Sequence, residues 1–189
     1  MSKLAERAQT NVVVAIPTQY KQFQKVFSKK EAQQFPGPQP WDHAIDLKPG
    51  APASIPGSVY HLTQKEDEAL EQFLQEHTKK GYVRESKSPY ASPFFFIKKK
   101  DGKLQLVQDY RKVNKWTIRN RDPLPLIPEM INRVKKATLF TKFDVRWGYN
   151  NVRIKQGDEW KAAFITNCGL FKPTVMFFRL MNSWPPFKP

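Results

Sequence analysis

The clearest hydrophobic pattern in the sequence lies between residues 63 and 80 and predicts one amphipathic helix. Thr63 precedes Glu66 by three residues, which is the spacing of a capping box, and Gly81 follows the last turn as a C-cap. The apolar positions recur at helical spacing at Ala69, Leu70, Phe73, Leu74 and His77. The segment therefore predicts a helix with a single apolar face.

A β-hairpin is predicted after this helix. Residues 94–98 are rich in strand-forming side chains, and residues 104–109 return as a second strand. The Asp-Gly pair at 101–102 lies between them and is a strong signal for a tight turn.

Further strands and one short helix are expected downstream. Residues 128–135 begin with a proline, which fits the first turn of a short helix. The apolar positions of residues 138–145 do not alternate cleanly, which favours a largely buried strand. Residues 160–166 and 174–178 suggest another strand pair around a turn at 167–169.

Prolines and glycines dominate the N-terminal third of the chain. Residues 1–60 are expected to form a linker or extended segment, with a short helix at 20–27 and a short strand at 44–47. Residues 61–180 then form one domain of α+β class, and residues 181–189 form a divergent Pro-rich tail.

The net charge of +15 changes this picture because it is concentrated in one block. Residues 79–155 hold 20 Lys and Arg against 6 Asp and Glu, whereas residues 1–78 hold 8 against 9. A concentrated positive field suits a polyphosphate partner such as RNA or DNA. A solvated basic surface without a partner is the alternative.

Several functional classes are disfavoured by composition. The single cysteine, Cys168, excludes an internal disulfide, and the three histidines lack the spacing of zinc ligands. The longest early apolar run, residues 12–16, is too short for a membrane span or a signal peptide. We therefore expect an intracellular protein without a membrane segment.

Four features carry candidate chemistry, each with a simpler alternative. Asp144 ends the expected buried strand, where a carboxylate can hold a divalent metal or merely cap a turn. The lysines of residues 98–103 could close over phosphates or only solvate the hairpin. Arg111 either pairs with Asp109 or contacts a phosphate. Aromatic residues among the cations stack on bases or belong to the core: Trp116, Trp147, Tyr149 and Trp160.

Taken in order, the motifs form a recognisable series. They are SPYASPFFFIKKKDG at 88–102, VQDYRKVNK at 107–115, PLPLIP at 123–128, FTKFD at 140–144 and WGY at 147–149. The series, extended by WDHAIDL at 41–47 and WKAAF at 160–164, closely resembles the reverse transcriptase of gypsy-type long-terminal-repeat (LTR) retrotransposons. The resemblance covers about residues 20–180.

The resemblance implies a right-hand polymerase fold with fingers and an incomplete palm. Such an enzyme is an RNA-directed DNA polymerase, which copies an RNA or DNA template by adding deoxynucleotides (dNTPs) to a primer with two Mg²⁺ ions. It implies that Asp144 and the Val145 carbonyl are metal ligands and that Tyr149 rejects a ribose 2′-hydroxyl by crowding. Lys99 would reach the incoming triphosphate, and Phe178 would form the floor of the nucleotide pocket.

The sequence departs from the family pattern at three places. The Tyr-x-Asp-Asp motif, which supplies two more carboxylates, is absent. Gln105 stands where the family has an arginine that grips the triphosphate, and a neutral amide cannot replace that donor. Arg179 replaces a glycine, Trp184 replaces a proline, and residues 185–189 look like drifted sequence.

These departures leave three readings of the present function. The chain is expected to be a reverse-transcriptase fragment that lacks the remainder of its polyprotein and is inactive alone. A non-catalytic nucleic-acid-binding module is the first alternative. A relic with no function and marginal folding is the second, because uncovered apolar strand edges favour aggregation.

Overall fold

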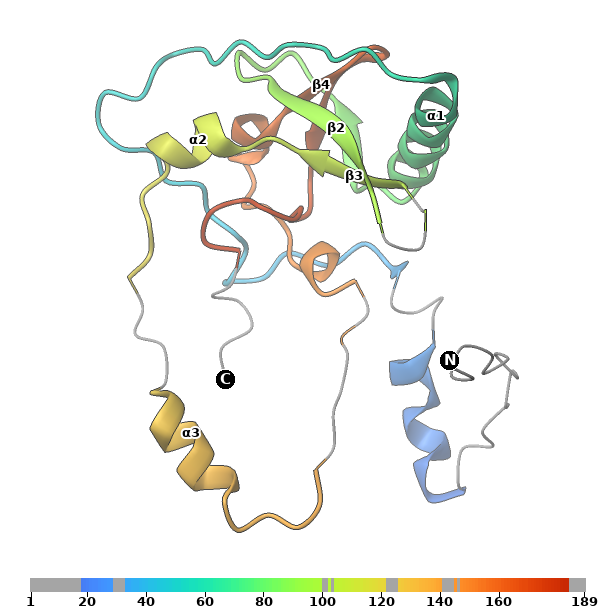
Figure 1. The fold of residues 1–189 in the computed structure, drawn as a ribbon, viewed down its shortest axis with the longest axis vertical. Helices are drawn as coiled ribbons and strands as arrows, with labels where there is room; N and C mark the ends of the chain where they lie inside the picture. Colours follow the sequence, from blue (N-terminus) through green and yellow to red (C-terminus); the bar gives the residue numbers. More distant parts are fainter. Residues whose placement is uncertain are drawn as a thin grey trace, which may run out of the picture.

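A computed structural model describes residues 18–28, 33–99, 102, 104–121, 126–140, 145 and 147–183. Its elements in chain order are η1 (Thr18–Phe27), α1 (Gln64–Lys79), β1 (Val83–Glu85), β2 (Ser92–Lys98), β3 (Leu104–Gln108), α2 (Arg111–Trp116), α3 (Ile127–Val134), η3 (Tyr149–Asn151), η4 (Glu159–Ala162), β4 (Phe164–Thr166) and β5 (Gly169–Pro173), where η marks a 3-10 helix. Figure 1 shows the sheet with α1 beside it and α3 lying apart from it.

The five strands form one mixed sheet in the order β1-β5-β4-β2-β3. All neighbours are antiparallel except β2 and β4, which run parallel. The expected α+β class is therefore confirmed. No helix in the described part of the chain is both long and apolar enough to cross a membrane.

Helix α1 confirms the first sequence prediction. The backbone N–H of Thr63 donates to the Glu66 carboxylate over 2.9 Å, as a capping box requires. Leu70, Leu74 and His77 are buried against the core. The C-cap is Lys80, and the predicted cap Gly81 follows it with φ +75°, one position beyond the observed cap.

The predicted hairpin is also confirmed. Strands β2 and β3 pair from Phe94 with Gln108 to Lys98 with Leu104. Gly102 has φ +78° and donates its N–H to the Lys99 carbonyl over 2.9 Å, which closes the turn.

The second strand pair has the predicted turn but shorter and shifted strands. Residues 160–162 belong to η4 instead of a strand, and residues 174–178 lie beyond the end of β5. The physical reason is Asp158, whose carboxylate accepts the Ile45 N–H over 2.8 Å and a bond from Lys161. These bonds hold the chain in a tight turn before β4 begins.

The expected buried strand at 138–145 is wrong for the residues that can be described. Leu139 is 90% exposed and Phe140 is 73% exposed, and neither pairs with a strand of the sheet. Residues 141–144 lie outside the described residues. The preceding short helix is confirmed as α3, with Pro128 in its first turn.

The N-terminal segment contributes more contacts than an extended linker requires. Ile45 and Ile55 are buried in the core. The expected strand at 44–47 is wrong, because only isolated bridges form there, from His43 to Ile154 and from Leu47 to Thr117. The expected helix at 20–27 is found as η1, and the division into three regions stays a prediction.

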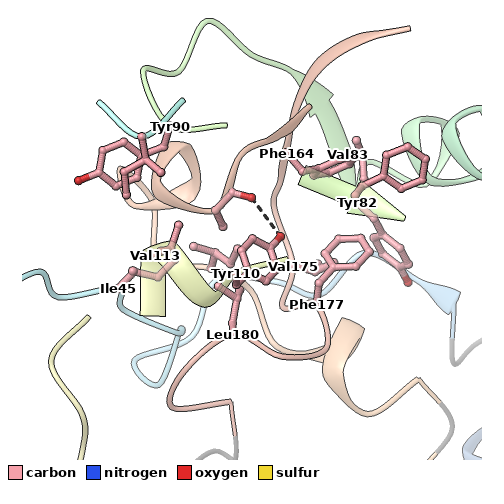
Figure 2. Packing of buried hydrophobic residues seen from close by; sticks show 14 of the residues in the cluster. Ile45, Tyr82, Val83, Tyr90, Tyr110, Val113, Phe164, Val175, Phe177 and Leu180 are labelled. Atoms are coloured by element: carbon pink, nitrogen blue, oxygen red, sulfur yellow. Dashed lines mark hydrogen bonds between the residues drawn. The ribbon is translucent and has the colours of Figure 1, made fainter. Parts of the chain in front are cut away.

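The core lies between the sheet, α1, α2 and the segment that follows β5 (Figure 2). Tyr110 is completely buried there, and its hydroxyl donates to the Ala162 carbonyl over 3.0 Å. Burial also raises the pKa of Tyr110, so this hydroxyl stays protonated. The bond fixes the start of α2 against η4. Helix α2 in turn positions residues 178–182 through Asn114.

Candidate functional site

Tyr149 and Phe178 form a ring pair at the edge of the core. Their centroids lie 5.7 Å apart and their planes cross at 76°, which is the edge-to-face arrangement that aromatic rings prefer. Tyr149 begins η3, whereas Phe178 follows β5. Phe178 remains exposed, so the pair offers an aromatic surface to a sugar or a base.

The turn after Phe178 is fixed by two asparagines. The Asn114 side chain in α2 donates to the Arg179 carbonyl over 2.8 Å and accepts the Met181 N–H over 2.9 Å. Asn182 accepts the Asn120 N–H over 2.9 Å and donates to the Ile118 carbonyl over 2.8 Å. We call residues 178–182 the asparagine-clamped turn; it positions Phe178 relative to Tyr149.

Arg111 pairs with Asp109, as one of the two sequence-based alternatives predicted. Its guanidinium donates through Nε to Asp109 Oδ1 over 2.8 Å and through Nη2 to Oδ2 over 2.6 Å. These hydrogen bonds lower the pKa of Asp109 below its usual value. The outer edge of the Arg111 side chain remains exposed, so the pairing does not exclude a phosphate contact.

Lys99 lies at the exposed end of the β2–β3 hairpin, on a different element from the ring pair. Its neighbours Lys100, Asp101 and Lys103 lie outside the described residues. Gln105 is half-buried in β3 opposite Ile97. The structure therefore brings Tyr149 and Phe178 together and leaves the role of Lys99 as a prediction.

A family model described as reverse transcriptase (RNA-dependent DNA polymerase) matches residues 97–183. Two transposon polyproteins of Schizosaccharomyces pombe, Tf2-3 and Tf2-4, are each 32% identical to the chain over 162 residues. The match covers 85% of this chain and 12% of each polyprotein. Residues 97–183 of the chain therefore match the reverse-transcriptase family. The resemblance to an LTR-retrotransposon reverse transcriptase is therefore confirmed.

Solved structures agree at the level of the fold. The foamy viral protease-reverse transcriptase in complex with dsDNA aligns with a TM-score of 0.66 at 21% identity, covering 94% of this chain and 38% of that chain. The same viral protein in complex with an RNA/DNA hybrid aligns at 0.63 and 20%, covering 80% and 20%. The described part of this reverse-transcriptase chain therefore has a partial polymerase fold.

The metal site of this reverse-transcriptase chain cannot be built from the described residues. Among them, no group of three or more His, Cys, Asp or Glu side chains could hold a metal ion. Asp144 lies outside the described residues, and the neighbouring Val145 is exposed. The described residues alone do not fit a divalent ion, so metal binding by Asp144 and Val145 stays a prediction.

One departure from the reverse-transcriptase pattern has a clear structural consequence. Arg179, which stands where the family has a glycine, has φ +77°, in the left-handed region that favours glycine. The backbone at this position therefore has a glycine-type conformation although the side chain is arginine. Trp184, the second replacement in this motif, lies outside the described residues.

Two features were not predicted from the sequence: the hydrogen bonds by which Asn114 and Asn182 hold residues 178–182, and which of the tryptophans pack against the core. Asn182 has φ +65°, and asparagine is enriched in left-handed turns, which is the one signal that pointed to a turn here. Trp116 and Trp160 pack against the core, as the simpler alternative predicted. Trp147 is exposed instead, with the Lys80 ammonium 5.4 Å from its ring centroid.

Proposed function

We propose that this chain forms the fingers and the first part of the palm of an RNA-directed DNA polymerase. The match of residues 97–183 to the reverse-transcriptase family and the partial polymerase fold support this function, with residues 61–180 as the domain concerned. The observation that carries it is the Tyr149–Phe178 pair, held in place by Asn114. We expect this pair to contact the sugar and base of an incoming dNTP.

The remaining substrate contacts follow from the matching motif positions. Tyr149 would reject a ribose 2′-hydroxyl by crowding, beside a pocket floor formed by Phe178. Lys99, at the exposed hairpin end, would reach the triphosphate as a mobile point charge. The free edge of the Arg111 guanidinium would contact a second phosphate.

Mg²⁺ is the ion that the family implies, with the Asp144 carboxylate and the Val145 carbonyl as its ligands in this chain. An ion held there would supply Lewis-acid activation at the primer hydroxyl and neutralise charge on the triphosphate. Two divalent ions repel each other and need several carboxylates nearby, but the sequence has no Tyr-x-Asp-Asp motif. We therefore propose that the chain alone binds substrates without extending a primer.

The proposed macromolecular partner is an RNA or DNA template-primer. Its support is the basic block of residues 79–155, together with structural relatives that were solved with dsDNA and an RNA/DNA hybrid. Several phosphate contacts release several counterions, so the affinity should fall steeply with salt. The need for dNTPs and a template favours an intracellular location.

Fluorescence anisotropy with a labelled template-primer tests this function on the whole chain. We expect the affinity to fall by at least about tenfold between 50 and 200 mM salt. With the template-primer bound, Lys99→Ala should weaken the binding of an added dNTP, whereas Lys65→Ala, on the exposed face of α1, should not. An affinity that does not change with salt would contradict the proposal.

A non-catalytic nucleic-acid-binding module is the second candidate, favoured by the basic block alone. Primer extension with Mg²⁺ on the purified chain tests the inactivity that the two candidates share. Both candidates predict no extension by the chain alone. Template-dependent synthesis that Asp144→Asn abolishes would establish an active polymerase and refute inactivity.

A further inference from the structure

Arg179 presents a guanidinium beside the proposed nucleotide contact. Its side chain is exposed, and its guanidinium carbon lies 5.9 Å from the centroid of the Phe178 ring. Phe178 in turn contacts Tyr149. Within the described residues, no carboxylate forms an ion pair with Arg179. The cation is therefore available to an anionic ligand.

The backbone holds this arginine in an unfavourable conformation. A left-handed φ of +77° is unfavourable for an L-residue other than glycine, because the Cβ atom crowds the backbone. The Asn114 side chain bonds the Arg179 carbonyl and the Met181 N–H, and so keeps the turn in this geometry. Strained residues that the surroundings hold firmly are found preferentially at functional sites.

The charge of a second arginine, Arg179, also acts on the carboxylate of Asp109. Arg111 binds Asp109 through two nitrogens, and Arg179 lies close enough to help lower the pKa of Asp109, after the larger contribution of Arg111. One carboxylate and two guanidinium groups that act on it leave an excess positive charge. Planar guanidinium groups match the oxygens of a phosphate and stack on aromatic rings.

We propose that Arg179, together with Arg111 across Asp109, forms a phosphate-binding site beside Phe178. In this site Arg179 supplies a charged planar donor that the neutral amide of Gln105 cannot supply. The site rests on the proposed polymerase function. The phosphate belongs either to a nucleoside triphosphate or to a nucleic-acid backbone, and two probes distinguish these sources.

The test uses the whole chain and three variants. Arg179→Asn removes the charge but tolerates the left-handed backbone, and Arg179→Lys keeps the charge without the planar donor. Arg84→Asn is the matched control, because Arg84 is an exposed arginine on β1. Inorganic tripolyphosphate is measured by calorimetry, and a short oligodeoxynucleotide without terminal phosphates by anisotropy.

We expect Arg179→Asn to weaken at least one probe about tenfold, which is the effect of losing one charge-assisted contact. Arg179→Lys should lose less, and Arg84→Asn should bind both probes as the parent does. A loss confined to tripolyphosphate assigns the site to a triphosphate. A loss confined to the oligodeoxynucleotide assigns the site to a nucleic-acid backbone. In that case the slope of log affinity against log salt concentration should also be smaller in magnitude by about one.

Equal binding of both probes by Arg179→Asn and the parent would overturn the site, as would an equal loss in Arg84→Asn. A second variant, Arg179→Gly, should lose the same binding while melting at a higher temperature, because it relieves the backbone strain. The proposed function fails separately, if the parent does not bind a template-primer. If the parent binds and Arg179→Asn matches it, only the phosphate site fails.

Discussion

Helices α1 and α3 have comparable apolar stripes but opposite surroundings. Leu70 of α1 is 0% exposed and packs in the core, whereas Ile127 of α3 is 71% exposed and no residue of α3 is buried. α1 also has a capping box, and α3 has no side-chain cap. An apolar stripe therefore shows that a helix has a face to cover, but does not show what covers it.

The difference has an energetic consequence. An eight-residue helix without tertiary packing is shorter than the roughly 12–15 residues at which isolated helices become marginally stable in water. Helix α1 gains its stability from the burial of Leu70, Leu74 and His77. The folding unit of the described chain is therefore the sheet with α1 and α2, and α3 contributes little to its stability.

The largest test of this difference exchanges a buried and an exposed phenylalanine for alanine. Phe164 in β4 is 0% exposed, so Phe164→Ala should cost about 3–5 kcal/mol of unfolding free energy. Phe140, which follows α3, is the matched control, and Phe140→Ala should stay within about 0.5 kcal/mol. Urea unfolding measures both, and similar losses would show that the region after α3 is packed too.

The next effect is a dependence of stability on pH that comes from histidines buried in the packed part of the chain. Burial lowers the pKa of His77 below its usual 6.5, so the unfolded chain accepts this proton more readily. Stability should therefore fall as the pH drops below 6.5, by up to about 1.4 kcal/mol per pH unit for this histidine. Buried His43 acts in the same direction.

Urea unfolding at several pH values between 7 and 5 measures this slope. His77→Phe should reduce the slope of unfolding free energy against pH by the contribution of about one proton, because the phenylalanine side chain does not titrate. His61 is exposed, and His61→Gln is the matched control that should leave the slope unchanged. An unaltered slope in His77→Phe would assign the dependence to other groups.

The elements that were predicted correctly from the sequence are those that depend on local signals. The capping box at Thr63 and the turn at Gly102 act within a few residues, and both are present. The failures depend on distant partners. The strand predicted at 160–166 begins only at Phe164, because the Asp158 carboxylate holds a turn before it. This carboxylate bonds Ile45, 113 residues away. Leu139 and Phe140 look like strand residues, but the sheet gives them no neighbour.

The candidate site divides in the same way. The resemblance implied that Tyr149 and Phe178 both line the nucleotide pocket, and the structure places their rings in contact. No local pattern predicts that Asn114 fixes the turn 65 residues later. The position of the Arg179 charge beside Phe178 depends on the hydrogen bonds from Asn114, so the site could be recognised only from the folded chain.

A smaller effect comes from the cap of α1. Thr63→Ala removes a hydroxyl that bonds Glu66 over 2.8 Å, and should cost about 1 kcal/mol of global stability. Thr63→Ser is the control that keeps the hydroxyl. Because α1 belongs to the folding unit, the loss should appear in urea unfolding of the whole chain. A loss confined to fraying of the first turn would contradict this.

The smallest expected effect comes from giving α3 the cap that α1 already has. Leu126 is the N-cap of α3 with an extended backbone, φ −66° and ψ 129°, and Glu129 lies three residues later. Leu126→Ser therefore creates the same Ser-x-x-Glu box, with Leu126→Ala as its control. Hydrogen exchange of the α3 amides should slow about fivefold, which corresponds to about 1 kcal/mol of local stability.

Global stability should not follow this local gain. Since the apolar face of α3 is exposed in the described chain, ordering the helix adds no burial to the sheet core. Urea unfolding of Leu126→Ser should match the parent within about 0.5 kcal/mol. A global gain equal to the local one would mean that α3 unfolds together with the sheet, and the difference between the two helices would then lie in their caps instead of their burial.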